Sequence, residues 1–220
     1  MKQAKGSIQF AGVLFILATV GSILGGMMIG TAVPDAGTSV LTAANRTPLM
    51  IGVLLELVNV LCVLGIGSIL ASALRSGSDR AATGYAVLRT VEAVSCTVAT
   101  LAPLALLYSI GSAAGFTGAI FAVRTGVMNL LVPVFFSLGA LVLYVAMFRQ
   151  RVVPRFISIW GFAGAILILA SNVLGFLLPN GLGESLPMML GLPIILNELF
   201  LGVWLIIKGF RESVTGMASK

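Results

Sequence analysis

The chain has 220 residues, of which 59% are hydrophobic and only 9% are charged, and its formal net charge is +6. Its mean hydropathy is +1.12, and since an ordinary soluble domain is about 25% charged, this composition excludes a soluble globular protein and indicates an integral membrane protein. No polar, charged or Pro/Gly/Ser-rich segment is long enough to form a soluble domain or a linker. We therefore treat residues 1–220 as a single transmembrane domain.

Six segments are apolar enough to cross the membrane as helices, which takes about 20 residues for about 30 Å of hydrocarbon. They cover approximately residues 8–30, 48–74, 84–108, 126–148, 157–178 and 188–208. Transmembrane β-strands would instead alternate polar and apolar residues over about ten positions. The sequence therefore predicts an all-α integral membrane bundle of six transmembrane helices.

The 8–30 segment follows Lys2 and Lys5, as the core of a signal peptide would. Its apolar run of about 23 residues is longer than the roughly 7 to 15 residues of a signal core, so we expect a retained helix. Two Gly-x-x-x-Gly spacings, GSILG at 21–25 and GMMIG at 26–30, permit close helix packing. We expect these glycines to contact a neighbouring helix of the same chain.

Polar residues lie close together in the sequence of three predicted spans. Glu56 and Asn59 share a helical face in 48–74, and Arg89 and Glu92 share one in 84–108. Asn197 and Glu198 are adjacent in 188–208. A charge at the centre of a span costs about 2.5 to 3.5 kcal/mol, so each charged member is expected to have a polar partner or a hydrated cavity. Helix rise places Glu56 and Glu92 within about 6 Å of each other in height, with Glu198 in the same layer.

These pairs predict one buried cluster in the middle of the membrane. Arg89 is its expected central counter-ion, and three carboxylates surround it. Three acids against one base leave excess negative charge, so at least one carboxyl is expected to be protonated or neutralised by a bound cation. The candidate binding residues are Glu56, Asn59, Arg89, Glu92, Asn197 and Glu198.

Lys and Arg residues are distributed unequally between the two sides of the predicted bundle. With the N-terminus inside, the outer loops contain only Arg46 and Arg124, while all the others except Arg89 lie at cytoplasmic ends. This bias predicts that both termini are cytoplasmic, and the short loops favour the inner (plasma) membrane of a prokaryote. The expected partner is the lipid bilayer rather than nucleic acid, because the basic residues form no contiguous patch. A homo-oligomer or a membrane complex partner is left open.

The sequence offers little support for a catalytic or cofactor site. Because histidine is absent, His-based acid–base catalysis and imidazole-ligated haem or zinc are excluded. Cys62 and Cys96 lie inside spans without metal-binding or disulfide spacing, so we expect small buried side chains. No nucleophile elbow, metal triad or nucleotide motif occurs. No cofactor, metal or catalytic residue is predicted, and enzymatic activity is left undecided.

Three motifs in order, LRTVEAV (88–94), VVPRFISIWGFAGAI (152–166) and LNELFLGVWLIIKGF (196–210), resemble a widespread prokaryotic family of multi-spanning membrane proteins, classed as domain of unknown function 4386. The resemblance implies six helices over most of the chain, and it transfers no activity. The matching residues are Arg89, Glu92, Ala93, Pro154, Arg155, Trp160, Gly161, Glu198, Gly202, Trp204, Leu205, Lys208 and Gly209.

Three functional classes remain compatible with the sequence. The first is a midplane site that binds or conducts a proton, a cation or a small amphipathic ligand. The second is a membrane enzyme that acts on a lipid-like substrate, with a carboxylate as acid or base. The third is a structural or accessory subunit whose buried polar network only fixes helix packing. A hydrated cavity at the cluster would favour the first class over the third.

Overall fold

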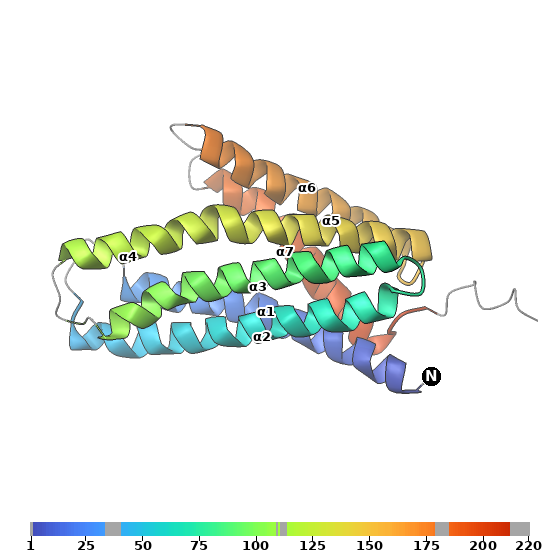
Figure 1. Cartoon of the computed structure of the whole chain (residues 1–220), viewed down its shortest axis with the longest axis horizontal. Coiled ribbons are helices and arrows are strands. Elements are labelled where there is room, and N and C mark those ends of the chain that lie inside the picture. Colours follow the sequence, from blue (N-terminus) through green and yellow to red (C-terminus); the bar gives the residue numbers. More distant parts are fainter. Residues whose placement is uncertain (1, 34–40, 109, 111–113, 179–184, 212–220) are drawn as a thin grey trace, which may run out of the picture.

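A computed structural model describes residues 2–33, 41–108, 110, 114–178 and 185–211, and the polypeptide is helical almost throughout these ranges (Figure 1). No β-strand occurs within them. The elements in chain order are α1 (Lys2–Ala32), the 3₁₀ turn η1 (Ala43–Asn45), α2 (Arg46–Leu74), α3 (Asp79–Tyr108), α4 (Ala114–Gly126), the π-helical segment η2 (Val127–Leu131), α5 (Val132–Gln150), α6 (Arg155–Leu177) and α7 (Ser185–Ile207).

Within the described ranges, six helical stretches are long and apolar enough to span a membrane. They are Lys5–Ala32, Ala43–Leu74, Asp79–Tyr108, Thr117–Gln150, Arg155–Leu177 and Leu186–Ile207. The predicted six-helix membrane bundle is therefore confirmed, and the protein is a multi-pass membrane protein. The cytoplasmic location of the termini stays a prediction.

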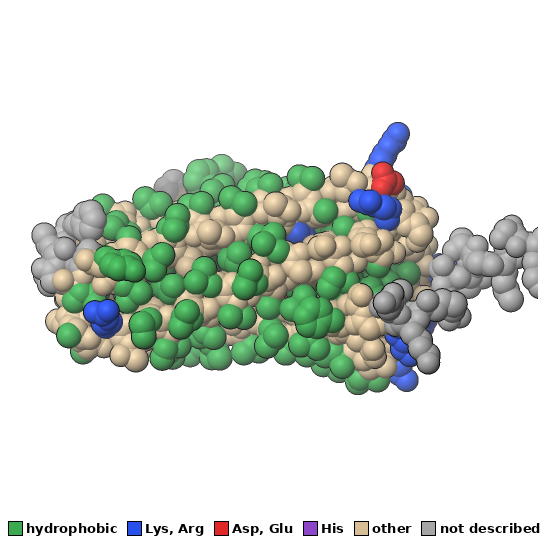
Figure 2. All heavy atoms as spheres, turned by 60° about the horizontal axis from the view of Figure 1, so that its bottom comes forward, with side chains coloured by type: hydrophobic (Ala, Val, Ile, Leu, Met, Phe, Trp, Pro, Cys, Tyr) green, Lys and Arg blue, Asp and Glu red, His purple; other side chains and the backbone are tan. Residues whose placement is uncertain are grey.

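The outer surface of the bundle is that of a protein surrounded by lipid. Large apolar side chains such as Leu61 and Phe176, each 68% exposed, cover its sides, and Figure 2 shows this apolar cover with the basic side chains gathered mainly at the end where the N-terminus lies. In lipid, exposed apolar side chains carry no hydrophobic penalty, whereas backbone polar groups must be paired, which helices achieve internally.

The helices form a closed ring in which each packs on the next. The order around the ring is α1, α2, α3, α5, α6, α7 and back to α1, and α4 packs on α3. At the end of the bundle that holds the N-terminus, Gln9 Nε2 of α1 donates a hydrogen bond to the Ile206 carbonyl of α7 at 2.9 Å. Toward the opposite end, α6 diverges from α5 (Figure 1). The ring is therefore closed by a hydrogen bond between α1 and α7 at the end with the N-terminus, and α5 and α6 are farther apart at the opposite end.

Glycines set the closest helix approaches around this ring. Where α1 crosses α7, a Cβ atom on Gly12 would lie 2.5 Å from the Gly202 carbonyl oxygen. Gly21 and Gly25 face α2, where a Cβ on Gly25 would lie 3.2 Å from Glu56 Cγ. The first Gly-x-x-x-Gly spacing thus contacts a helix of the same chain, as predicted. Gly26, in the second spacing, has no atom within 4 Å of its added Cβ.

Replacement of Gly12 by alanine tests the α1–α7 crossing. The added methyl group would force the two helices apart, and we expect a loss of about 1 to 3 kcal/mol in the free energy of unfolding, which is the usual range for overpacking. The measurement is reversible unfolding in detergent micelles. Gly26→Ala is the matched control, since it makes the same change in the same helix with nothing to collide with. Equal stability of the two variants would contradict the crossing.

Candidate functional site

The fourth span begins earlier than the sequence analysis placed it. The sequence predicts a span over residues 126–148 and an outer-loop position for Arg124, whereas the helical span runs from Thr117 to Gln150. Arg124 is therefore part of a transmembrane helix, and its side chain is only 7% exposed. The prediction was wrong because the glycines at 115 and 118 were interpreted as loop, although the following AIFAV is apolar enough to continue a helix.

Arg124 of α4 forms a two-pronged ion pair with Glu56 of α2. Its Nη1 donates to Glu56 Oε2 at 2.9 Å, and its Nη2 donates to Glu56 Oε1. The same Nη1 donates to the Ala99 carbonyl of α3 at 3.1 Å. Thr100 Oγ1, also on α3, lies 2.9 Å from Glu56 Oε2. This pair thus joins three helices, and bidentate guanidinium–carboxylate contacts are among the strongest hydrogen-bonded pairs.

The predicted single cluster around Arg89 is therefore corrected. Glu56 is not bound by Arg89 but by Arg124, an arginine predicted to lie in an outer loop. Thr100 was not singled out either. The sequence contained a usable signal for Arg124, because a second buried cation lowers the excess of acids from two to one.

Arg89 of α3 forms the second buried pair with Glu92 on the same helix. Its Nη1 donates to Glu92 Oε2 at 2.9 Å, and its guanidinium carbon lies 5.8 Å from the centroid of the Phe136 ring of α5, which is within range of a cation–π interaction. Two glycines make room for it: a Cβ on Gly67 of α2 would lie 2.9 Å from Arg89 Cβ, and one on Gly139 of α5 would lie 3.5 Å from Arg89 Cδ.

The two pairs lie at different depths. Arg89 is ten residues from the start of α3 and Glu198 nine residues from the end of α7, which puts both about 14 to 15 Å from the helix ends near the N-terminus. Glu56 is 18 residues from the end of α2 at the same side, or about 27 Å. The Arg89–Glu92 pair and Glu198 therefore form a lower layer, and the Arg124–Glu56 pair an upper one.

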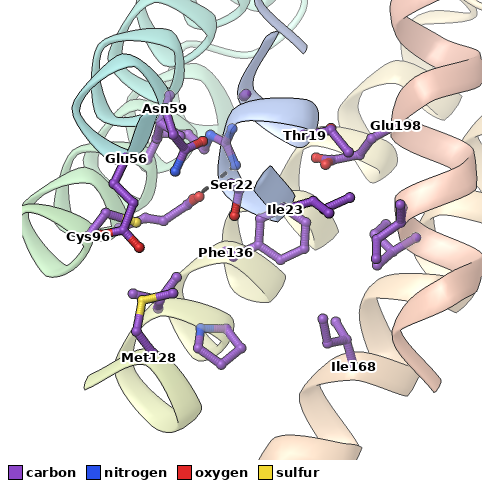
Figure 3. Close-up of a pocket in the computed structure, with 18 of the residues that line it drawn as sticks. Thr19, Ser22, Ile23, Glu56, Asn59, Cys96, Met128, Phe136, Ile168 and Glu198 are labelled. Atoms are coloured by element: carbon purple, nitrogen blue, oxygen red, sulfur yellow. Dashed lines mark hydrogen bonds and ion pairs between the residues drawn. The ribbon is translucent and has the colours of Figure 1, made fainter. Parts of the chain in front are cut away.

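A cavity of about 220 Å³ connects the two layers inside the ring. Figure 3 shows Glu56, Asn59 and Cys96 on one side of it and Glu198 of α7 on the other, with Phe136, Met128 and Ile168 completing the wall. All six helices of the ring contribute lining residues. The polar part of the lining comprises Thr19, Ser22, Glu56, Asn59, Arg89, Glu92, Thr100 and Glu198.

The cavity opens beside α1. Ser22 and Ile23 line it and are also exposed on the surface of the molecule, Ile23 to 45%. Both residues lie within the α1 span, well away from its ends. The opening is therefore lateral, at a depth where the surrounding medium is lipid.

The six predicted site residues separate into those that line the cavity and one that does not. Glu56, Asn59, Arg89, Glu92 and Glu198 all line it. Asn197, which is fully buried, instead donates from Nδ2 to the Ile157 carbonyl of α6 at 3.0 Å. Asn197 thus ties α7 to α6 and is not part of the cavity wall.

Glu198 differs from the other acids in having no direct partner. Within the described residues it makes no hydrogen bond or ion pair, although it shares the cavity wall with Arg89. Several buried polar atoms of the same region are also unpaired among these residues, namely Arg89 Nε, Tyr85 Oη and Tyr144 Oη. Buried polar atoms almost always have a partner, so this region calls for water or a ligand.

The sequence of this chain matches one described family. Residues 10–209 match the model of the family described as Domain of unknown function (DUF4386). The chain belongs to this family. The match covers most of the first span and all of the other five, and it confirms the resemblance noted in the sequence. No curated protein and no solved structure matches the chain, so membership in DUF4386 defines the family without assigning an activity.

Removal of the upper arginine tests the role of the Arg124–Glu56 pair. Arg124→Met leaves the Glu56 carboxylate buried without its partner, and breaking a buried pair in this way costs about 3 to 5 kcal/mol of unfolding free energy. The double variant Arg124→Met/Glu56→Gln should recover part of the loss, which a double-mutant cycle in detergent measures. Arg46→Met, at an exposed arginine, is the control. Additive effects of the two single changes would contradict the pairing.

Proposed function

We propose that the cavity binds a small cation, either a proton or the cationic group of a small amphipathic molecule, with Glu198 as the binding carboxylate. The observation that carries the proposal is the unpaired carboxylate of Glu198 in the wall of a laterally open cavity. An ionised carboxylate at membrane depth is costly without a partner, so a positive charge beside it is favourable.

The charge count of the cavity supports this choice of ligand. The upper pair is balanced, one arginine against one glutamate. In the lower layer Arg89 faces two carboxylates, and Glu92 takes the direct contact at 2.9 Å. With all groups ionised, the cavity therefore carries one net negative charge at Glu198. A bound cation or proton restores neutrality, which an anionic ligand would not do.

The remaining wall supports an amphipathic ligand. Ile23, Val132, Phe136, Ile168 and Ile194 give the cavity an apolar part beside its carboxylates. Ligand sites commonly combine such apolar walls with a few polar groups that fix orientation. A molecule that dissolves in the bilayer can reach Glu198 through the opening beside α1 without crossing a polar loop.

A second, structural role is favoured for the upper layer alone. The Arg124–Glu56 pair joins α2, α3 and α4 and leaves neither side chain in need of a further charge. We therefore assign this pair to helix packing, and the cation site to the lower layer. In keeping with the distribution of Lys and Arg, we propose that the protein lies in a prokaryotic plasma membrane with both termini in the cytoplasm.

Choline and its neutral isostere 3,3-dimethylbutanol are a suitable pair of probes for Glu198. We expect the wild-type chain in lipid nanodiscs to bind choline more tightly than the alcohol, and Glu198→Gln to remove this preference, because the amide has no charge to offer the cation. Calorimetry measures both affinities. Binding should weaken as the pH falls and the carboxyl is protonated, and this pH dependence should vanish in the variant.

The matched control is Asp79→Asn, which removes one carboxylate at an exposed position outside the cavity. Unaltered choline preference in Glu198→Gln, or an equal loss in Asp79→Asn, would contradict the assignment of Glu198 as the binding group.

The two native cysteines test whether the cavity is hydrated. Both are free and buried, but Cys96 lines the cavity and Cys62 does not. We expect a small thiol reagent such as methanethiosulfonate ethylammonium to modify Cys96 faster than Cys62, as measured by mass spectrometry of the single-cysteine variants. Choline should slow only the reaction of Cys96. Equal rates at the two positions would show that the cavity does not admit water-borne reagents.

A further inference from the structure

A second cavity lies at the N-terminal end of the bundle, in the groove between α3 and α5. Its volume is about 680 Å³, and it is separate from the central cavity, with which it shares no lining residue. The lining residues are Gly77, Ser78, Arg80, Ala81, Gly84, Leu141, Val142, Val145, Ala146, Arg149 and Gln150. The proposed cation site does not use this groove.

The groove has a basic mouth and an apolar floor. Arg80, in the first turn of α3, and Arg149, in the last turn of α5, are both exposed and have no ion pair among the described side chains. No acidic residue lines the groove, and Asp79, the acid beside Arg80, is paired with Arg75 at 3.2 Å. Leu141 lies nine residues before the end of α5, so the apolar floor reaches about 14 Å from that end.

The mouth is held in place by contacts that do not use these two arginines. Gln150 Nε2 donates to the Leu74 carbonyl at 3.1 Å, which ties the end of α5 to the α2–α3 turn. Ser78 Oγ accepts a hydrogen bond from the Ala81 backbone at 3.2 Å and so caps α3. A Cβ on Gly77 would lie 2.3 Å from the Gln150 side chain. The two guanidinium groups are left to face solvent or a ligand.

We propose that this groove binds one anionic phospholipid, with its phosphate between Arg80 and Arg149 and an acyl chain along Leu141, Val142 and Val145. Two unpaired arginines at the membrane boundary match a phosphate, and the start of α3 adds the positive end of a helix dipole. The apolar floor continues into the α5 span. It offers no polar contact to a free phosphate, but an acyl chain can pack against it. Basic recesses between transmembrane helices commonly bind such headgroups.

Native mass spectrometry of the full chain in detergent can test the proposal, with phosphatidylglycerol and phosphatidylcholine of identical acyl chains as probes. We expect one phosphatidylglycerol to be retained in preference to phosphatidylcholine. Arg80→Gln/Arg149→Gln should weaken phosphatidylglycerol binding by about tenfold or more, since each basic residue near the surface contributes to the attraction. Arg155→Gln/Lys208→Gln removes the same charge from exposed positions at the same end outside the groove, and should have a much smaller effect.

Gly84 provides an independent test of the acyl-chain part of the site. It lines the groove, and a Cβ added there meets no atom within 4 Å, so Gly84→Leu should fill the groove without disturbing the helices. We expect this variant to lose the retained lipid at unchanged thermal stability. Gly175→Leu makes the same change at another helical glycine with open surroundings, outside the groove, and should retain the lipid.

Three results would overturn the proposal. Equal weakening by the two double variants would mean that the arginines act only through general surface charge. If water-soluble glycerol phosphate competed for the groove as strongly as phosphatidylglycerol does, the groove would be a phosphate site to which the acyl chain contributes nothing. A dimer that disappears in Gly84→Leu, without bound lipid in the wild type, would identify the groove as a contact between two copies. None of these outcomes bears on the choline preference of Glu198.

Discussion

The high cost of an unpaired charge inside an apolar bundle is the constraint on which the rest of this structure depends. Arg124 lies inside the bundle because α4, η2 and α5 continue as one helical stretch, and its guanidinium is paired there with Glu56 of α2 and the Ala99 carbonyl of α3. The positions of two glycines are explained by the same requirement to pair buried charges. Gly25 lets α1 pass close to Glu56, and Gly67 lets α2 pass close to Arg89. Helix packing is thus arranged around the buried charges.

The two buried ion pairs differ in what they contribute to packing. The Arg124–Glu56 pair connects residues 68 positions apart and so resists separation of the helices. Arg89 and Glu92 are three residues apart on α3, so their ion pair connects no two helices. Burying such a pair costs desolvation free energy. Because both residues belong to one helix, the pair does not compensate this cost with an ionic contact between two helices. Under the proposed function, the Arg89–Glu92 pair serves binding in the cavity that it shares with Glu198.

The number of spans could be predicted from the sequence because a helix needs about 20 apolar residues to cross the bilayer, and runs of that length are easily recognised. It also selected Arg89, Glu92 and Glu198, since charge in a span is rare enough to be informative. It failed at Arg124 because the glycines that precede this residue are as typical of a loop as of a close-packed helix. The start of the span therefore depends on the contact of Arg124 with Glu56, which the sequence alone does not show. It failed at Asn197 because adjacent side chains of an α-helix point about 100° apart, so Asn197 contacts α6 while Glu198 lines the cavity. The cavity itself requires knowledge of how six helices pack, which periodicity does not provide.

The position of Glu198 on α7 relates the cavity to the closed end of the ring. Glu198 and Gly202 are four residues apart and therefore lie on one face of the helix. Gly202 lies at the crossing with Gly12, where backbone atoms of α1 and α7 approach most closely. Under the proposed function, a cation would bind one helical turn from this crossing. Neutralisation of Glu198 then changes the electrostatic environment of the part of α7 that closes the ring. The Arg124–Glu56 pair lies in another layer and on other helices, and it keeps α2, α3 and α4 together.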